Sequence, residues 1–129
     1  MTAPRPPLAC EPPEGFTPST LDEGFLNQIG PLYQSQAEDG HHVIAFRATV
    51  RHLNLFKAVH GGMLATLADV AVGTNIARAG ACFEPSGTLT LSLDYIDAAH
   101  VGEWIEAHTA LRKRAGRVRF GDCDILADG

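Results

Sequence analysis

Two features of the sequence could do chemistry together: the run His60-Gly61-Gly62 and the acid Asp69. Glycines at the start of a helix expose backbone N–H groups that have no partner within the helix, and these groups and the helix dipole both favour negative charge. Such a terminus can stabilise a developing oxyanion. A carboxylate in an apolar helix is costly unless it is paired, hydrogen-bonded or used. Asp69 is therefore a candidate catalytic acid or base.

The spacing of these groups limits how they can cooperate. Gly61 and Asp69 are eight residues apart, which is roughly 12 Å along a helix. One acyl carbon cannot lie about 3 Å from both groups. If both act in one reaction, Asp69 must meet the glycine terminus of a second, antiparallel copy of the helix, as a two-fold dimer allows. The sequence thus predicts two identical composite sites per dimer.

Each of these residues also has a purely structural explanation. Asp69 could be satisfied by a neighbouring group, and the two glycines could serve only tight packing. His60 could be no more than a residue at the helix start.

The elements that must position the site are a long helix and a sheet. Residues Gly61–Ala79 contain strong helix formers and no proline, and Gly80 follows. The apolar residues of this run surround the whole helix axis, so the helix must be buried, most naturally by a sheet that curls around it. The sequence predicts an α+β fold with a single domain over residues 19–129.

Alternation of apolar and polar residues predicts the strands. The expected strands cover Ile44–Val50, Thr88–Tyr95, Trp104–Lys113 and about Arg117–Leu126, and the last pattern slips near Gly121 as a β-bulge would cause. In the first of them, Ile44, Phe46, Ala48 and Val50 share one face. Ala127-Asp128-Gly129 resembles a hairpin turn, so we expect a last strand that is missing from this chain.

The N-terminal region is expected to be simpler. Residues 1–18 are rich in proline and predict a flexible tail without a core. Thr20-Leu21-Asp22-Glu23 fits a capping box, which predicts a short helix from about Leu21 that ends at Gly30-Pro31.

Composition excludes several classes of function. A net charge of −5 gives no general basic surface for nucleic acid or anionic lipid. The longest apolar stretch, Met63–Ala79, is interrupted by polar residues and is too short for a membrane span. Three cysteines and scattered histidines lack ligand spacing, so we expect no metal site and no disulfide framework. A reducing cytoplasm is the expected compartment.

The segment Asn54–Asp69, with its asparagine, His-Gly-Gly and helical acid, closely resembles the signature of hotdog-fold acyl-CoA thioesterases, in the PaaI-like (phenylacetic acid degradation) branch of the 4-hydroxybenzoyl-CoA thioesterase superfamily. Phe25–Tyr33 and Leu93–Glu103 are also similar to this branch, so the resemblance covers about Phe25–Gly129. It implies a curled antiparallel sheet wrapped around a long central helix, in a homodimer that often pairs into a tetramer. It also implies a final strand after Gly129.

The resemblance implies a role for each matching residue. Asp69 would be the general base or nucleophile, and the Gly61 N–H would polarise the thioester carbonyl. Asn54 and His60 would orient the carbonyl, the sulfur or the attacking water, while Thr88 would hold that water. Thr90 lies on the same strand face as Thr88, and Asn54 could instead cap a turn. The substrate would be an acyl-CoA, so that coenzyme A arrives with the substrate and no separate cofactor is expected.

A cluster of basic residues spans the last predicted hairpin: Arg112, Lys113, Arg114, Arg117 and Arg119. Arg112, Arg114 and Arg117 are candidates to bind the phosphates of coenzyme A, with Gly62 and Thr90 as further substrate contacts. The alternative is a solvated edge that discourages strand aggregation.

Two other functions remain open on the same fold. A hydratase or dehydratase acting on acyl thioesters would need His60 and would release no thiol. A non-catalytic protein would bind acyl-CoA without turnover.

Overall fold

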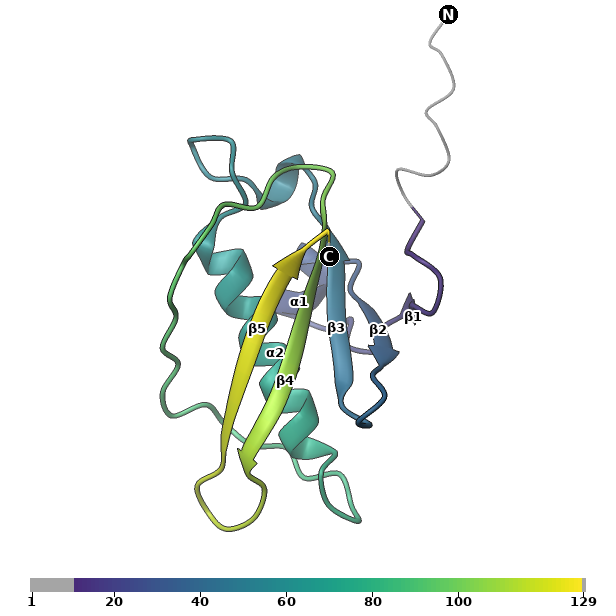
Figure 1. Ribbon diagram of the computed structural model, residues 1–129, viewed down its shortest axis with the longest axis vertical. Helices are drawn as coiled ribbons and strands as arrows, with labels where there is room; N and C mark the ends of the chain where they lie inside the picture. Colours follow the sequence, from purple (N-terminus) through teal and green to yellow (C-terminus); the bar gives the residue numbers. More distant parts are fainter. Residues whose placement is uncertain (1–10, 129) are drawn as a thin grey trace, which may run out of the picture.

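The structure, a computed structural model that describes residues 11–128, is a five-stranded antiparallel sheet with one long helix against it. Figure 1 shows the helix α2 crossing one face of the sheet. The strand order is β1-β2-β3-β4-β5. The strands are β1 (Thr17–Pro18), β2 (Tyr33–Gln36), β3 (His42–Arg47), β4 (Trp104–Lys113) and β5 (Phe120–Ala127); the helices are α1 (Phe25–Ile29), the 3-10 turn η2 (Val50–His52) and α2 (Gly61–Ala77). This arrangement confirms the predicted α+β class.

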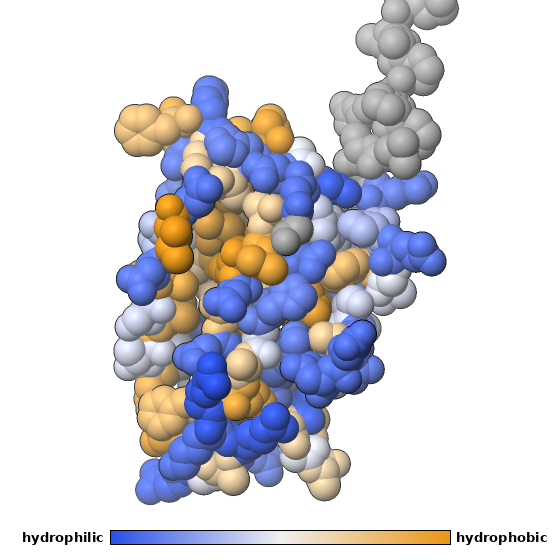
Figure 2. Space-filling view, in the orientation of Figure 1, coloured by the Kyte–Doolittle hydropathy of each residue, from blue (hydrophilic) through white to orange (hydrophobic). Residues whose placement is uncertain are grey.

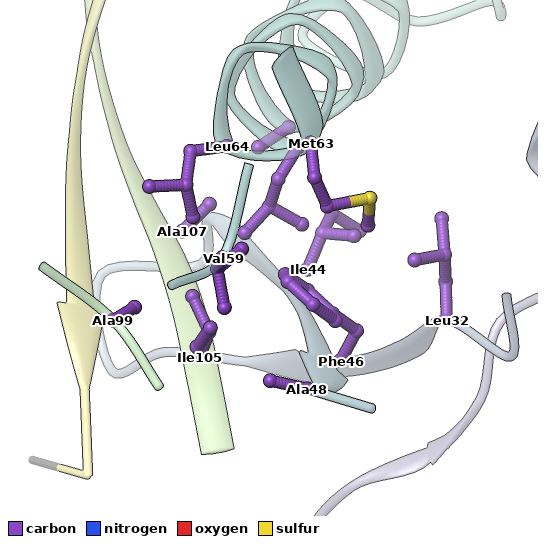
Figure 3. Packing of buried hydrophobic residues seen from close by; sticks show 12 residues of the cluster. Leu32, Ile44, Phe46, Ala48, Val59, Met63, Leu64, Ala99, Ile105 and Ala107 are labelled. Atoms are coloured by element: carbon purple, nitrogen blue, oxygen red, sulfur yellow. The ribbon is translucent and has the colours of Figure 1, made fainter. Parts of the chain in front are cut away.

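The core lies between α2 and the sheet. Ile44 and Phe46 of β3, Leu67 of α2 and Ile105 of β4 are almost completely buried, and removing each such side chain from water stabilises the fold by roughly 1.5–3 kcal/mol. Figure 3 shows side chains of β3, β4 and α2 meeting in this layer. The core therefore fixes α2 on the sheet.

The opposite side of α2 is more open than the sequence predicted. Asp69, Val72 and Gly73 are only half-buried, although the helix residues that face the sheet are buried. Within the described residues, the sheet covers one side of α2 and leaves the other side more exposed. α2 also ends at Ala77, two residues before the predicted end.

The segment Thr88–Tyr95 departs most from the prediction. It runs outside β5 along the open side of α2 (Figure 1), but it pairs with no strand in the described part of the chain. Leu89 is 81% exposed, which the predicted half-buried strand would not allow. The alternating pattern alone cannot make a strand, because a strand needs a hydrogen-bonded neighbour.

The β4–β5 hairpin matches the prediction well. β4 has the predicted bounds, and β5 begins at Phe120 where the sequence suggested about Arg117. The register shifts between Leu111 and Lys113, opposite Gly121, which confirms the predicted irregularity near Gly121. The strand expected after Gly129 lies outside the described residues.

The first predicted strand is also placed differently. Val50 was expected on the buried face with Ile44, but it is 76% exposed. β3 ends at Arg47 and the chain turns into η2, so the alternation that predicted a longer strand stops there.

The N-terminal predictions need three corrections. Thr17–Pro18 pairs with β2, so part of the expected tail joins the sheet; residues 1–10 of that tail lie outside the described residues. The helix begins at Phe25 and not near Leu21, because the Ser19 hydroxyl accepts the Leu21 N–H at 3.0 Å in a local turn and Gly24 precedes the helix with a φ of 60°. The strand β2 was not predicted, because its polar sequence shows no alternation.

Candidate active site

The start of α2 leaves one backbone donor without an acceptor. The His60 Nδ1 atom accepts the Gly62 N–H at 2.8 Å, and the His60 carbonyl accepts the N–H groups of Met63 and Leu64. Within the described residues, the Gly61 N–H has no acceptor. A donor fixed at a helix terminus and free of internal partners is suited to a developing oxyanion.

Tyr95 packs against the first residue of α2. Its hydroxyl donates to the Gly61 carbonyl at 2.7 Å. A Cβ atom at position 61 would lie 3.1 Å from the Tyr95 Cζ atom, which is closer than ordinary contact. A side chain at position 61 would therefore require the Tyr95 ring to shift. The sequence analysis missed this contact, since alternation marks Tyr95 only as an apolar strand residue.

The candidate acid lies in the middle of α2 and is held by one side-chain bond. The Thr88 hydroxyl donates to the Asp69 Oδ1 atom at 2.5 Å. Both residues line a cavity of about 640 Å³ between α2, the extended segment and the start of β5. Thr90 and Gly73 also line this cavity, but Thr88 is the residue that contacts the carboxylate. The structure therefore favours Thr88 over Thr90 as the partner of Asp69.

Asn54 lies apart from both groups. Its side-chain oxygen accepts the N–H groups of Phe56 and Ala58, at 2.8 and 3.2 Å, so it caps its own turn. Asn54 lines neither cavity described here. These contacts agree with the alternative explanation from the sequence, in which Asn54 caps a turn. The same turn exposes Leu55 and Phe56 at 95% and 89%.

The two parts of the predicted site line different cavities. His60 and Gly62 line a second cavity of about 180 Å³, together with residues of α1 and η2. Asp69 lines only the larger one, and the two cavities share no residue. Within one copy the structure therefore does not bring the helix start and the acid together, in agreement with the distance expected from their spacing.

The basic cluster divides into paired and unpaired residues. Arg112 forms an ion pair with Asp122 at 2.7 Å, and Arg119 forms one with Glu84 at 2.6 Å. Arg114 and Arg117 are exposed and have no acidic partner in the described chain; Arg117 lines the larger cavity. Figure 2 shows strongly hydrophilic side chains near the β4–β5 turn and apolar ones along the margin where the extended segment runs.

Among residues 11–128 there is no group of three or more histidine, cysteine or acidic side chains that could hold a metal ion, and no helix long and apolar enough to cross a membrane. Burial raises the pKa of the Cys123 thiol to about 11. That thiol is protonated at neutral pH and is therefore a poor nucleophile.

Two comparisons with known proteins, one with a family model and one with a single relative, give matching results. A family model described as "Thioesterase superfamily" matches residues 56–129. A Pseudomonas aeruginosa protein named "Putative esterase PA0474" is 37% identical over 113 residues, which are 88% of this chain and 84% of that relative.

Solved structures share the fold. A mutant of phenylacetic acid degradation protein PaaI from Thermus thermophilus is 25% identical with a TM-score of 0.71, over 83% of this chain and 89% of that chain. A Bacillus halodurans protein, BH2602, solved with CoA, is 23% identical with a TM-score of 0.68, over 80% of this chain and 66% of that chain, and shows likeness of fold alone. Because the family model covers more than half of its length, this chain belongs to the thioesterase superfamily and adopts the hotdog fold of its PaaI-like branch.

Proposed function

We propose that the protein is an acyl-CoA thioesterase, which hydrolyses an acyl- or aryl-CoA to the free acid and CoA. One observation carries the proposal: a helix terminus with an unused N–H donor at Gly61 occurs on the same helix as a cavity-lining carboxylate, Asp69. These are the two groups that thioester hydrolysis needs, one for the oxyanion and one for the nucleophile. Family membership supports the same reaction.

In the proposed reaction, Asp69 takes a proton from a water molecule whose oxygen attacks the acyl carbon. The resulting oxyanion forms beside the Gly61 N–H. When the tetrahedral intermediate collapses, the C–S bond breaks and the proton passes to the CoA thiolate. In the alternative path, Asp69 attacks the carbonyl itself, and water then hydrolyses the mixed anhydride. Thr88, which donates to Asp69, would orient the carboxylate in either path.

We propose that each site is built from two copies of the chain, with Gly61 from one and Asp69 from the other. Gly61 lines neither cavity, but its neighbours His60 and Gly62 line a cavity that shares no residue with the cavity of Asp69, and this separation supports the arrangement. A two-fold dimer then has two sites, and two such dimers could associate into a tetramer. His60 of the glycine half-site would orient the thioester, while Gly62 and Thr90 would contact the substrate. The Asn54 side-chain oxygen is taken up by its own turn, so only its side-chain NH2 group would be left for a contact with the thioester.

The phosphates of CoA would bind at the β4–β5 turn. Arg114 and Arg117 are better placed for this than Arg112, because Arg112 is already paired with Asp122. A guanidinium group binds a phosphate with two hydrogen bonds, and unpaired guanidiniums need give up no internal partner. The structural relative solved with CoA supports this class of ligand. We further propose a cytoplasmic location, on the basis of the cysteine content.

Thiol release from a panel of aryl-, medium-chain and hydroxyacyl-CoA thioesters tests the proposal. We expect the wild type to hydrolyse at least one thioester and Asp69→Asn to lower kcat by about 10²–10⁴-fold, as loss of a general base does. Asp124→Asn is the matched control, because Asp124 is exposed on β5 and lines neither cavity; it should keep full activity. If the folded wild type releases no thiol from any member of the panel, the proposed function is wrong.

A further inference from the structure

We infer that Gly73 keeps a passage open for the pantetheine arm of CoA, the chain that joins the CoA phosphates to the sulfur. Gly73 lies in the second half of α2 and lines the same cavity as Asp69. The inference rests on the proposed function and deepens it, because it makes Gly73 a specificity-determining residue for CoA thioesters.

Close packing does not explain a glycine at position 73. Glycine inside a helix lowers the stability of the helix relative to alanine, because glycine loses more conformational freedom on folding. At Gly121, a Cβ atom would lie 2.9 Å from the Val72 Cγ1 atom, so packing accounts for that glycine. Apart from the backbone of α2 itself and the residues next to Gly73, no atom of the described chain lies within 4 Å of a Cβ built on Gly73. The space beside Gly73 is therefore available to a ligand.

This space lies one helical turn beyond the acid. Gly73 follows Asp69 by four residues, so the two lie on the same face of α2, roughly 6 Å apart along the helix axis. Both line the cavity of about 640 Å³, a volume within the usual range for ligand pockets. A ligand that places its acyl carbon near Asp69 and extends toward the end of α2 must therefore pass over Gly73.

The cationic end of the cavity lies farther along α2. The Glu84 N–H donates to the carbonyl of Ala77, the last residue of α2, and the Glu84 carboxylate pairs with Arg119 at 2.6 Å. Arg119 therefore lies beside the end of the helix, and Arg117 lines the same cavity. Figure 1 likewise shows the β4–β5 turn at the end of the molecule where α2 ends. Seen from the acid, the arginines thus lie beyond Gly73.

This order assigns the CoA side of the thioester to the passage. With the phosphates at the arginine end and the carbonyl at Asp69, the chain between them crosses Gly73, and the acyl group lies on the other side of the carbonyl. The arm carries two amide groups. Ser86, Thr90 and Ser92, whose hydroxyls can hydrogen-bond to amides, also line the cavity. A side chain on Gly73 would project into this path.

Calorimetric binding of free CoA tests the inference without the need for turnover. In Gly73→Val the new side chain fills the passage, and valine is no worse than glycine in a helix. We expect the Kd of CoA to rise on the order of tenfold, because the arm meets a steric clash. The Kd of 3′-phospho-ADP, which carries the CoA phosphates but lacks the arm, should change less than about twofold. Gly80→Val is the matched control, because Gly80 follows α2 and lines neither cavity; it should leave both Kd values unchanged.

Three results would overturn the inference. The first is a CoA affinity of Gly73→Val equal to that of wild type, which would leave the space to the acyl group. The second is an equal loss of affinity for CoA and 3′-phospho-ADP, which would show a general disturbance of the site. The third is dissociation of a wild-type dimer by Gly73→Val in sedimentation, which would show that position 73 faces a second copy.

A smaller side chain at the same position gives a second measure. Gly73→Ala should raise the melting temperature by roughly 2–5 °C, because alanine favours the helix and meets no neighbour. For a CoA thioester that the wild type hydrolyses, KM should rise by about two- to fivefold while kcat changes less than about twofold. A fall in melting temperature would contradict the open passage. If the wild type binds CoA but releases no thiol, the proposed function is wrong, and the two Kd values of Gly73→Val still decide whether the passage exists.

Discussion

The start and the middle of α2 differ in how completely the chain surrounds them. At the start, His60 caps the first turn, Tyr95 packs against Gly61, and the His52 carbonyl accepts the His60 N–H at 2.7 Å. In the middle, Asp69 is held by one bond from Thr88 and faces a cavity of about 640 Å³. The chain itself holds the start of α2 in place, whereas the middle of the helix faces an open cavity.

This difference indicates how each of the two proposed half-sites depends on the substrate and on a second copy of the chain. The amide half-site is ordered before any substrate arrives, as an oxyanion donor must be to act efficiently. The acid half-site leaves space beside it: apart from the backbone of α2 itself and the residues next to Gly73, no atom lies within 4 Å of a Cβ built on Gly73, one turn after Asp69. We interpret that open face as the side from which a substrate and a second copy of the helix start approach.

The first prediction concerns the close contact between β5 and the middle of α2. A Cβ atom at Gly121 would lie 2.9 Å from the Val72 Cγ1 atom. Gly121→Ala should therefore lower the free energy of unfolding by about 1–3 kcal/mol, the usual cost of overpacking. Gly80→Ala is the control, because its nearest neighbour would lie at 3.9 Å. Urea denaturation measures both, and equal stabilities would show that β5 does not pack closely on α2.

The second prediction concerns the bond that holds the acid. Thr88→Ala removes the donor to Asp69 and should lower kcat about tenfold, equal to about 1.4 kcal/mol of transition-state stabilisation. Thr88→Ser keeps the hydroxyl and should keep most of the activity. Thr90→Ala, which changes a cavity residue without contact to the carboxylate, should have a smaller effect on kcat. The reverse ranking of the two alanine variants would assign the role to Thr90.

The third prediction concerns the cap at the helix start. His60→Ala removes the acceptor for the Gly62 N–H and should lower the free energy of unfolding by about 1 kcal/mol. His60→Asn supplies a side-chain oxygen that can replace this acceptor, and should restore stability. If only the histidine supports turnover while both His60→Asn and wild type are equally stable, His60 acts on the substrate as well as on the helix.

The smallest expected effect is a pH dependence at His52. Burial lowers the pKa of this imidazole below 6.5. The Nδ1 atom accepts the Thr49 N–H, so Nε2 carries the proton and donates to the Ile29 carbonyl at 2.7 Å. Because the folded state resists protonation, its stability is full above about pH 6.5 and falls as the pH drops toward the lowered pKa.

Denaturation measured between pH 7.5 and pH 5 tests this pH dependence. His52→Gln should give a flatter profile than wild type. A residual slope is expected from His42, whose pKa is also lowered by burial and by Arg78. Identical profiles for the two proteins would exclude His52 as a source of the slope.

Much of the fold could be predicted because local pattern and topology agree. The apolar, proline-free run Gly61–Ala77 and the alternation in Trp104–Lys113 gave correct elements, and their neighbours in the sheet supply the expected partners. The prediction of a paired strand at Thr88–Tyr95 was wrong for the described chain, because pairing depends on a neighbour that alternation cannot reveal.

The candidate site was predictable in part for the same reason. The motif proposed Gly61 and Asp69 as site residues, and the helical rise predicted that they lie apart within one copy. Tyr95 and the choice of Thr88 over Thr90 depend on where a distant segment crosses the helix, 19 to 34 residues away in sequence. Single-sequence patterns contain no information about such crossings.

The central claim, that each site takes Gly61 from one copy and Asp69 from another, is tested most directly by mixing two inactive variants. Gly61→Pro, which removes the N–H donor and is tolerated at the first residue of a helix, and Asp69→Asn are unfolded together in equal amounts, refolded, and assayed for thiol release. Half of the randomly formed dimers are mixed, and each mixed dimer has one intact site, so about a quarter of wild-type activity should return. If the refolded mixture contains dimers but is no more active than the two variants alone, the composite site is wrong.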